Sequence, residues 1–212
     1  SDVCSSDLEI QKDQNIPIGL LNTSYGGTPA EAWTSKEGLS KEPSLTYYVD
    51  RVETAKKAFD LAKAEEKYKA DVEKWKADSE KYKAEAAAAK AAGKPFTKVA
   101  PRPPAKPGSG GVSAGSPTGL YNGMIAPLLP FAFKGAIWYQ GESNGSRAAE
   151  YRTLMPALIK DWRAKWGNEF PFFMVQLAPF KADGSDKVSY AELRDAQFNT
   201  TKILPKVEIG RA

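Results

Sequence analysis

Two short polar motifs in this 212-residue chain contain residue types that could do chemistry. The first, at residues 23–28, reads TSYGGT, and the second, at residues 141–145, reads GESNG. The second motif matches the G-x-S-x-G pattern of a nucleophile elbow, in which Ser143 would attack an ester carbonyl. The structural alternative is a tight glycine turn in which Ser143 or Asn144 caps a helix.

The chain contains no histidine, so no side chain has an ordinary pKa near 7 for general-base catalysis. A nucleophile elbow at Ser143 needs a histidine later in the chain, and its absence weighs against that interpretation. With Cys4 as the single cysteine, only carboxylates could bind a metal ion, and the sequence has no calcium-loop spacing. We therefore expect neither a metal ion nor a cofactor.

Three short apolar runs are the elements that would position the polar motifs. They lie at residues 16–22, 135–140 and 172–178. Their apolarity is continuous rather than alternating, which is typical of strands covered on both faces of a parallel sheet. A helical repeat of apolar residues separates the second run from the third. We expect Pro156 to kink this helix or to start a fresh turn, and Gly167 to end it.

The order of these elements predicts an α/β fold built on an open parallel sheet. Strand, helix, strand and a further helix at residues 190–201 follow one another, as right-handed crossovers require. Open parallel sheets bind ligands beyond the carboxyl ends of their strands. Both polar motifs directly follow predicted strands, so we expect the functional site at that edge.

Residues 47–118 are expected to form an insertion into this fold. From residue 47 to about residue 92 the chain is rich in Ala, Lys and Glu, and apolar or small residues recur every three or four positions, which predicts one long helix. Residues 94–119 are rich in Pro, Gly and Ser, which favours a return linker. The helix is either a solvated insertion or a coiled-coil arm for a partner or a second copy of the chain.

The overall composition excludes several classes of protein. No run approaches the roughly 20 apolar residues of a membrane-spanning helix, and 11% aromatic residues are too many for a wholly disordered chain. Lys and Arg number 30 against 26 Asp and Glu, but the two signs are mixed and no nucleic-acid-binding motif accompanies them. We therefore expect no membrane span and no nucleic acid partner.

The two ends of the sequence differ in character from the rest. Residues 1–8 and 208–212 resemble translated sequencing-adapter DNA, so they are excluded from the fold prediction. The natural insert would then run from residue 9 to residue 207. Residues 9–46 and 119–207 would form the first and second parts of one domain.

Four blocks of sequence match one known family in their order and spacing. The blocks are NIPIGLLNTSYGGTPAEAWTS at residues 15–35, GLYNGMIAPLLPFAFKGAIWYQGESN at 119–144, FPFFMVQLAPF at 170–180 and AELRDAQ at 191–197. Together they resemble the bacterial sialate O-acetylesterase family of SGNH-type carbohydrate esterases. The likeness covers most of residues 15–46 and 119–201, and the insertion resembles what some members carry.

The resemblance implies a flavodoxin-like (SGNH hydrolase) α/β fold with a long helical insertion. It also implies a serine esterase that removes acetyl groups from the hydroxyls of sialic acid or a related acetylated sugar. The family uses a Ser in an N-terminal GQSN-like block and a His in a C-terminal D-x-x-H-like block, and neither block is present in this sequence. The resemblance therefore implies an inactive fragment, truncated at both ends, of a periplasmic or secreted enzyme.

The resemblance assigns catalytic roles to four residues. Gly26 and Gly27 lack a Cβ and can bring backbone N–H groups close to the oxyanion of acyl transfer, with the side-chain amide of Gln140 as another donor. Glu142 is the carboxylate expected to orient the missing His, unless an Asp near that His does so. The structural alternatives are a tight turn for the glycines, a buried hydrogen-bonding residue for Gln140, and a salt bridge or helix-start carboxylate for Glu142.

Six further residues are candidates for contact with the sugar: Thr28, Glu31, Trp33, Ser143, Asn144 and Arg194. Trp33 could stack on a sugar ring or pack in the core. Arg194 could form a bidentate pair with the carboxylate of sialic acid, or an internal ion pair. Two interpretations compete with the esterase: a non-catalytic scaffold whose long helix binds a partner, and an α/β hydrolase that uses Ser143.

Overall fold

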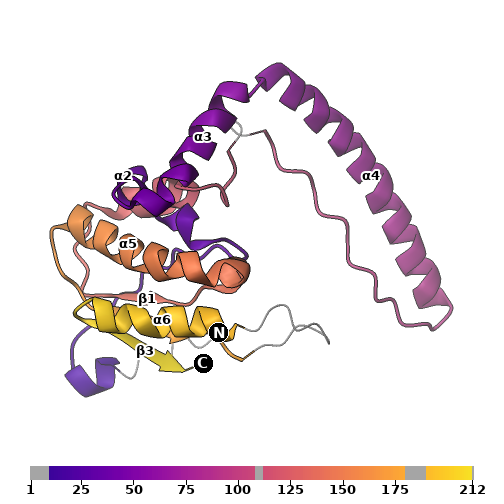
Figure 1. Cartoon of the computed structure of the whole chain (residues 1–212). Coiled ribbons are helices and arrows are strands. Elements are labelled where there is room, and N and C mark those ends of the chain that lie inside the picture. The colour runs from indigo at the N-terminus through magenta and orange to yellow at the C-terminus, as the bar shows by residue number, and fades with distance from the viewer. Residues whose placement is uncertain (1–9, 108–111, 180–189, 212) are drawn as a thin grey trace.

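The computed structural model describes residues 10–107, 112–179 and 190–211 (Figure 1). Residues 1–8, interpreted from the sequence as adapter-derived, lie outside these ranges. Residues 208–211, interpreted in the same way, form most of the last strand of the sheet.

A parallel sheet of three strands forms the base of the described fold. The strands, in sheet order, are β1 (Ala136–Trp138), β2 (Phe172–Gln176) and β3 (Val207–Arg211). The register pairs Phe172 of β2 with Ala136 of β1 and with Val207 of β3. The predicted α/β class with a parallel sheet is confirmed, and β1 and β2 lie within two of the three predicted apolar runs.

Two helices connect the strands and pack against each other over one face of the sheet (Figure 1). They are α5 (Ala148–Trp166), between β1 and β2, and α6 (Ala191–Ile203), between β2 and β3. Gly167 takes the left-handed conformation, with φ 61°, and ends α5 as its sequence position predicts. Pro156 lies inside α5 and does not divide the helix.

The opposite face of the sheet is open among the described residues. Ile137 of β1 and Phe173 of β2 are 61% and 48% exposed, whereas Trp138 and Phe172, which point the other way, are buried. The prediction that both faces are covered is therefore wrong for the described ranges. The reason is topological, because two successive right-handed crossovers in one direction place both helices on the same face.

Residues 16–22 do not form the strand that their apolar run predicts. Ile16, Leu20 and Leu21 are each about half exposed. A strand exists only when a neighbouring edge supplies hydrogen-bond partners. Within the described chain β1 pairs with β2 alone, and residues 16–22 do not join its other edge. Apolarity alone could not show whether that edge would be used.

The long helix predicted from residue 47 to about residue 92 is two helices. α3 (Thr46–Ala58) ends at Phe59, whose backbone is extended, and α4 (Leu61–Ala91) begins after it. Asp60 caps α4, because its side chain accepts a 3.1 Å hydrogen bond from the backbone N–H of Lys63. The break redirects α4 away from the body of the molecule (Figure 1).

The proline-rich segment returns alongside α4 and contacts it. The indole Nε1 of Trp75 donates a 3.0 Å hydrogen bond to the carbonyl of Pro101, and the rings of Tyr82 and Phe96 meet edge to face with centroids 5.2 Å apart. We call residues 61–107 the arm. The apolar stripe of α4, predicted as a possible coiled-coil surface, is contacted in the arm by the chain's own return segment.

The remaining helical elements are short. They are η1 (Ala30–Trp33), α2 (Lys36–Ser40), η2 (Pro43–Leu45), η3 (Tyr121–Ile125), η4 (Ala126–Leu128) and η5 (Glu142–Arg147). None of the helices in the described ranges has the length and apolarity needed to cross a bilayer.

An aromatic core ties η1 to the sheet and to α5. The ring of Trp138 in β1 meets Trp33 of η1 and Trp162 of α5 edge to face, with centroids 6.0 and 5.9 Å away. The indole N–H of Trp162 donates a 2.9 Å hydrogen bond to the carbonyl of Trp33. These contacts fix the chain that follows the first polar motif against the carboxyl end of β1.

Candidate active site

Asn144 is the centre of a buried hydrogen-bond network that joins both polar motifs. Its Oδ1 accepts hydrogen bonds from the Gln140 side-chain amide at 2.7 Å and from the backbone N–H of Ala30 at 2.9 Å. Its Nδ2 donates to Oε2 of Glu31 at 2.9 Å. Asn144 is fully buried, and pairing of every such polar group makes the junction rigid.

Gln140 lies directly after β1 and faces the first motif. Its Nε2 donates to the carbonyl of Thr28 at 3.2 Å as well as to Asn144, and its Oε1 accepts from the Tyr151 hydroxyl at 3.2 Å. Its own carbonyl accepts from the side chain of Gln197 at 3.1 Å. The half-buried Gln140 amide therefore holds Thr28 in place through internal hydrogen bonds.

The Gly26–Gly27 turn sits on this support. Gly27 has φ 71°, a left-handed conformation that glycine adopts without strain. Both glycines are exposed, and their N–H groups donate no hydrogen bond to any residue in the described ranges. Thr28 fixes the far end of the turn, because its hydroxyl donates to the carbonyl of Tyr25 at 2.7 Å and accepts from the indole of Trp33. The turn thus presents two unpaired backbone donors to solvent.

The chain beyond η1 is fixed by a buried carboxylate of α5. Asp161 accepts hydrogen bonds from the backbone N–H and the hydroxyl of Ser35, at 2.8 and 2.7 Å. Gly38 packs directly on this carboxylate, since a Cβ there would lie 2.6 Å from Asp161 Cγ. Residues 28–38 are therefore anchored at both ends, at Gln140 and at Asp161.

Arg147 and Glu31 form a largely buried ion pair beside the Asn144 network. Arg147 Nη2 lies 2.9 Å from Glu31 Oε1, and Nη1 lies 3.0 Å from Glu150 Oε1. Burial disfavours the charged guanidinium, but the carboxylate of Glu31 outweighs it and raises the pKa of Arg147. Arg147 also donates to the hydroxyl of the buried Tyr48. Arg147 therefore stays charged at neutral pH.

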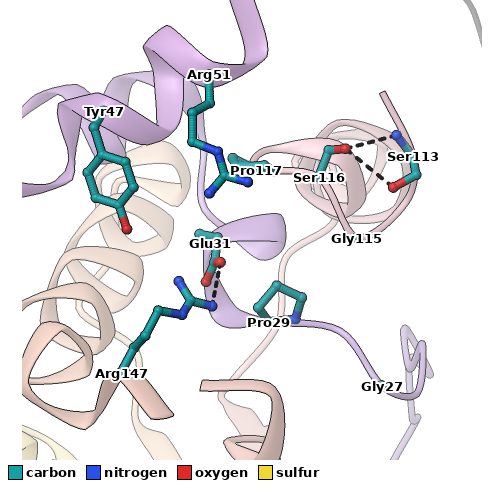
Figure 2. Close-up of a pocket in the computed structure, with 10 residues that line it drawn as sticks. All are labelled: Gly27, Pro29, Glu31, Tyr47, Arg51, Ser113, Gly115, Ser116, Pro117 and Arg147. Carbon is teal, nitrogen blue, oxygen red and sulfur yellow. Dashed lines mark hydrogen bonds and ion pairs between the residues drawn. The ribbon is translucent and has the colours of Figure 1, made fainter. Parts of the chain in front are cut away.

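This ion pair forms one wall of a cavity of about 470 Å³ (Figure 2). Tyr47 and Arg51 reach into the cavity from α3, and Gly27 lies at its edge. Residues 113–117 close the side opposite Tyr47. The cavity therefore extends from the Gly26–Gly27 turn to the start of the insertion.

A second cavity, of about 810 Å³, also borders this turn. Gly26 and Gly27 line it together with residues from the base of the arm, including Lys67, Tyr68 and Lys106. Gly27 borders both cavities, so the two form a cleft that runs past the turn. The insertion thus contributes side chains to the cleft.

The second half of the chain is similar to a known esterase family. Residues 105–209 match the family described as carbohydrate esterase, sialic acid-specific acetylesterase. This match agrees with the resemblance of the sequence blocks to sialate O-acetylesterases.

Individual relatives of the chain agree with this esterase family. The chain is 29% identical to a sialate O-acetylesterase of Rattus norvegicus over 188 residues, which cover 84% of this chain and 29% of that protein. It is 27% identical to a sialate O-acetylesterase of Homo sapiens over 192 residues, which cover 84% of this chain and 25% of that protein. The chain therefore spans less than a third of the length of these relatives.

A solved structure of a carbohydrate acetylesterase from Xanthomonas citri is similar to this chain. The TM-score is 0.59 at 28% sequence identity, and the match covers 97% of this chain and 32% of that protein. The match therefore includes the insertion as well as the sheet.

Glu142 and Ser143, two candidates for esterase chemistry, are exposed at the start of η5. Neither side chain forms a hydrogen bond or ion pair with the described part of the chain, so Glu142 is accessible to a partner group. The first glycine of the motif is structural, because a Cβ on Gly141 would lie 2.7 Å from Cδ2 of Leu193 in α6. The Ser143 hydroxyl contacts no base in the part of the chain that the structure describes, and the chain has no histidine to supply one.

Two sugar-binding candidates lie away from the cleft. Trp33 is only 5% exposed within the aromatic core, which is the packing alternative rather than a stacking surface. Arg194 Nη2 donates to Oε1 of Gln176 at 3.1 Å, and Gln176 in turn donates to the carbonyl of Arg194 at 3.3 Å. Among the described residues the Arg194 guanidinium therefore bonds to an amide, and no ion pair of Arg194 occurs there.

The sequence missed the residues that make the cleft polar. Arg147, Arg51 and Tyr47 were not predicted as site residues. A local signal existed for Arg147, because it stands three residues before Glu150 at the start of a helix. No group of three or more His, Cys, Asp or Glu able to hold a metal ion occurs in the ranges that the structure describes.

Proposed function

We propose that this chain carries the substrate cleft and oxyanion-binding turn of a carbohydrate esterase that removes O-acetyl groups from sialic acid or a related sugar. The observation that supports this most directly is the Gly26–Gly27 turn. Its two unpaired N–H groups lie beyond the carboxyl end of β1, fixed by the hydrogen bond from Gln140 to Thr28. This is the edge at which open parallel sheets bind ligands.

The turn would act on the charge that develops during acyl transfer. When a nucleophile adds to the acetyl carbonyl, the carbonyl oxygen becomes an oxyanion. Donors that are already aligned stabilise that charge without reorganising. The N–H groups of Gly26 and Gly27 are such donors. Both side-chain N–H groups of Gln140 are used internally, so we assign Gln140 the role of holding the turn.

The nucleophile and the base are proposed to be a Ser and a His that lie outside this sequence. The family resemblance implies both residues, and the exposed carboxylate of Glu142 supports its proposed role in orienting the His. The proposal also includes a periplasmic or secreted location for the whole enzyme, for which the resemblance is the support.

Ligand binding to the present chain tests this proposal. Nitrogen-15-labelled chain would be titrated with 9-O-acetyl-N-acetylneuraminic acid and, as control, with N-acetylneuraminic acid that lacks the O-acetyl group. We expect the amide signals of Gly26 and Gly27 to shift more with the acetylated sugar, because only that sugar carries the ester carbonyl. Shifts confined to α6 or the tip of the arm, or no shifts at all, would show that the turn is not the acetyl site.

A further inference from the structure

The cavity of Figure 2 is lined by one guanidinium group that forms no ion pair with the described residues. Two guanidinium groups and one carboxylate line it, and Arg147 pairs with Glu31 at 2.9 Å and with Glu150, beside the cavity, at 3.0 Å. The remaining cation is Arg51, which forms no ion pair with any residue in the described ranges. An anion that enters the cavity would therefore meet an available guanidinium.

Arg51 projects toward this cavity from a helix that is anchored beside it. It lies in α3, one helical turn after Tyr47, so both side chains project from one face of that helix toward the cavity (Figure 2). Tyr47 is fixed by its hydrogen bond to Glu150 and by stacking on Tyr48, with ring centroids 4.2 Å apart. Arg51 thus projects from a helix whose neighbouring side chains are already anchored.

The other surfaces of the cavity suit a polar ring. Ser113 and Ser116 place hydroxyl groups opposite Tyr47, and Pro29 and Pro117 add apolar surface (Figure 2). The volume of about 470 Å³ is in the usual range for small-molecule sites. A carbohydrate needs this combination, because it presents both hydroxyl groups and C–H faces.

We infer that Arg51 binds the carboxylate of an acidic sugar substrate in this cavity, and that this contact selects acidic over neutral acetylated sugars. The inference rests on the proposed function, since Gly27 lines the same cavity and would place the acetyl ester at one end of it. In a 9-O-acetylated sialic acid the carboxylate and the ester lie at opposite ends of the molecule. The planar guanidinium can pair with both carboxylate oxygens.

Arg51 replaces Arg194 as the arginine for this role. Arg194 is occupied by Gln176 and lines neither cavity, whereas Arg51 points into the cleft. Arg51 belongs to the insertion that the sequence suggested was without chemistry. The insertion would therefore contribute to substrate selection.

Calorimetric titration of the chain with two ligands tests the inference. The ligands are 9-O-acetyl-N-acetylneuraminic acid and its C1 methyl ester, which differ only in the negative charge. For Arg51→Gln we expect about tenfold weaker binding of the free acid, as for loss of a hydrogen-bonded charge pair, and unchanged binding of the methyl ester. Arg51→Lys should recover part of the loss, because the charge is kept and the bidentate geometry is not.

Arg102→Gln is the matched control, because Arg102 is an exposed arginine of the arm without an ion pair in the described ranges. It should bind both ligands as the wild-type chain does. If the wild-type chain binds both ligands equally, or if Arg51→Gln weakens both alike, the carboxylate contact is wrong while the esterase proposal stands. If the wild-type chain binds neither ligand, the inference and the proposed function are both wrong.

Discussion

The side-chain amide of Gln140 donates a 2.7 Å hydrogen bond to Oδ1 of Asn144, four residues later in the chain. Through this bond the end of β1 and the turn before α5 share one junction with η1, which Asn144 reaches through Ala30 and Glu31. The cleft depends on the junction because Thr28, which follows the glycine turn, is held by the same Gln140 amide.

Asn144→Asp should destabilise the fold. The substitution keeps the side-chain shape but replaces the Nδ2 donor with a carboxylate oxygen facing Glu31 Oε2, where 2.9 Å now separates donor and acceptor. We expect a loss of roughly 2–4 kcal/mol in the free energy of unfolding, since a buried hydrogen bond becomes a buried repulsion. Urea unfolding monitored by tryptophan fluorescence measures this loss.

Asn122→Asp is the control for that substitution, because Asn122 is exposed and, among the described residues, its side chain bonds only to the hydroxyl of Thr118, at 3.3 Å. Its free energy of unfolding should change by less than about 0.5 kcal/mol. Equal effects at the two positions would show that Asn144 is not the junction described above.

Gly27→Ala should weaken the binding of acetylated sugar more than it weakens the fold. Alanine at φ 71° costs on the order of 1 kcal/mol, and the strain would turn the N–H groups away from a bound carbonyl. Gly93→Ala is matched, because Gly93 has φ 63° and, like Gly27, open space where a Cβ would lie. We expect Gly27→Ala and Gly93→Ala to lose similar stability, and only Gly27→Ala to lose affinity for the sugar. Reduced affinity in both variants would argue against a specific role for the turn.

The chain itself should show no Ser–His-type esterase activity with 4-nitrophenyl acetate. It has no histidine, and the Ser143 hydroxyl contacts no base in the described ranges. Ser143→Ala should therefore release 4-nitrophenol at the same background rate as the wild-type chain. Robust turnover that is lost in Ser143→Ala would reverse the assignment and favour an α/β hydrolase.

Alkaline pH should unfold the chain through Tyr48. Burial, followed by the hydrogen bond to Glu150, raises the pKa of this phenol in the folded state. Above about pH 10, where an unfolded Tyr loses its proton, the unfolded state is stabilised while folded Tyr48 stays neutral. The free energy of unfolding should therefore fall as the pH rises above that value. Tyr48→Phe should make this fall less steep in urea titrations between pH 8 and 11. A parallel profile for the two proteins would contradict the assignment.

Local signals in the sequence predicted the elements that carry the site. Continuous apolarity identified β1 and β2, and Gly167 marked the end of α5 through its left-handed preference. These features depend on residues a few positions apart. The same is true of the Gly26–Gly27 turn, because two adjacent glycines indicate a tight turn and Gly27 adopts the left-handed conformation that glycine favours.

The contacts that bring these elements together into one site join residues far apart in the sequence, so local patterns could not predict them. Asn144 bonds to Glu31, 113 residues away, and Ser35 bonds to Asp161, 126 residues away. No periodicity or spacing contains these pairings. The same limit explains residues 16–22, because strand formation depends on a neighbouring edge rather than on the run itself. Arg51 was not predicted as a site residue, because it lies in a helix whose composition indicates a solvated surface.

Substitutions in the arm can distinguish the two interpretations of the long helix, a solvated insertion and a coiled-coil arm. Trp75 and Tyr82 of α4 contact Pro101 and Phe96 of the return segment, so the apolar stripe is partly covered from within the chain. Trp75→Ala should release the return segment. Nitrogen-15 relaxation measurements should then show faster backbone motion at residues 94–107 and unchanged signals from β2. Lys76→Ala, an exposed change on the same helix, should leave that motion unaltered.

We also expect the wild-type chain to sediment as a monomer, because the return segment already contacts the half-buried stripe that a second helix would need. Concentration-dependent dimers that Trp75→Ala abolishes would instead identify the stripe as a coiled-coil surface, with the return segment displaced when the dimer forms.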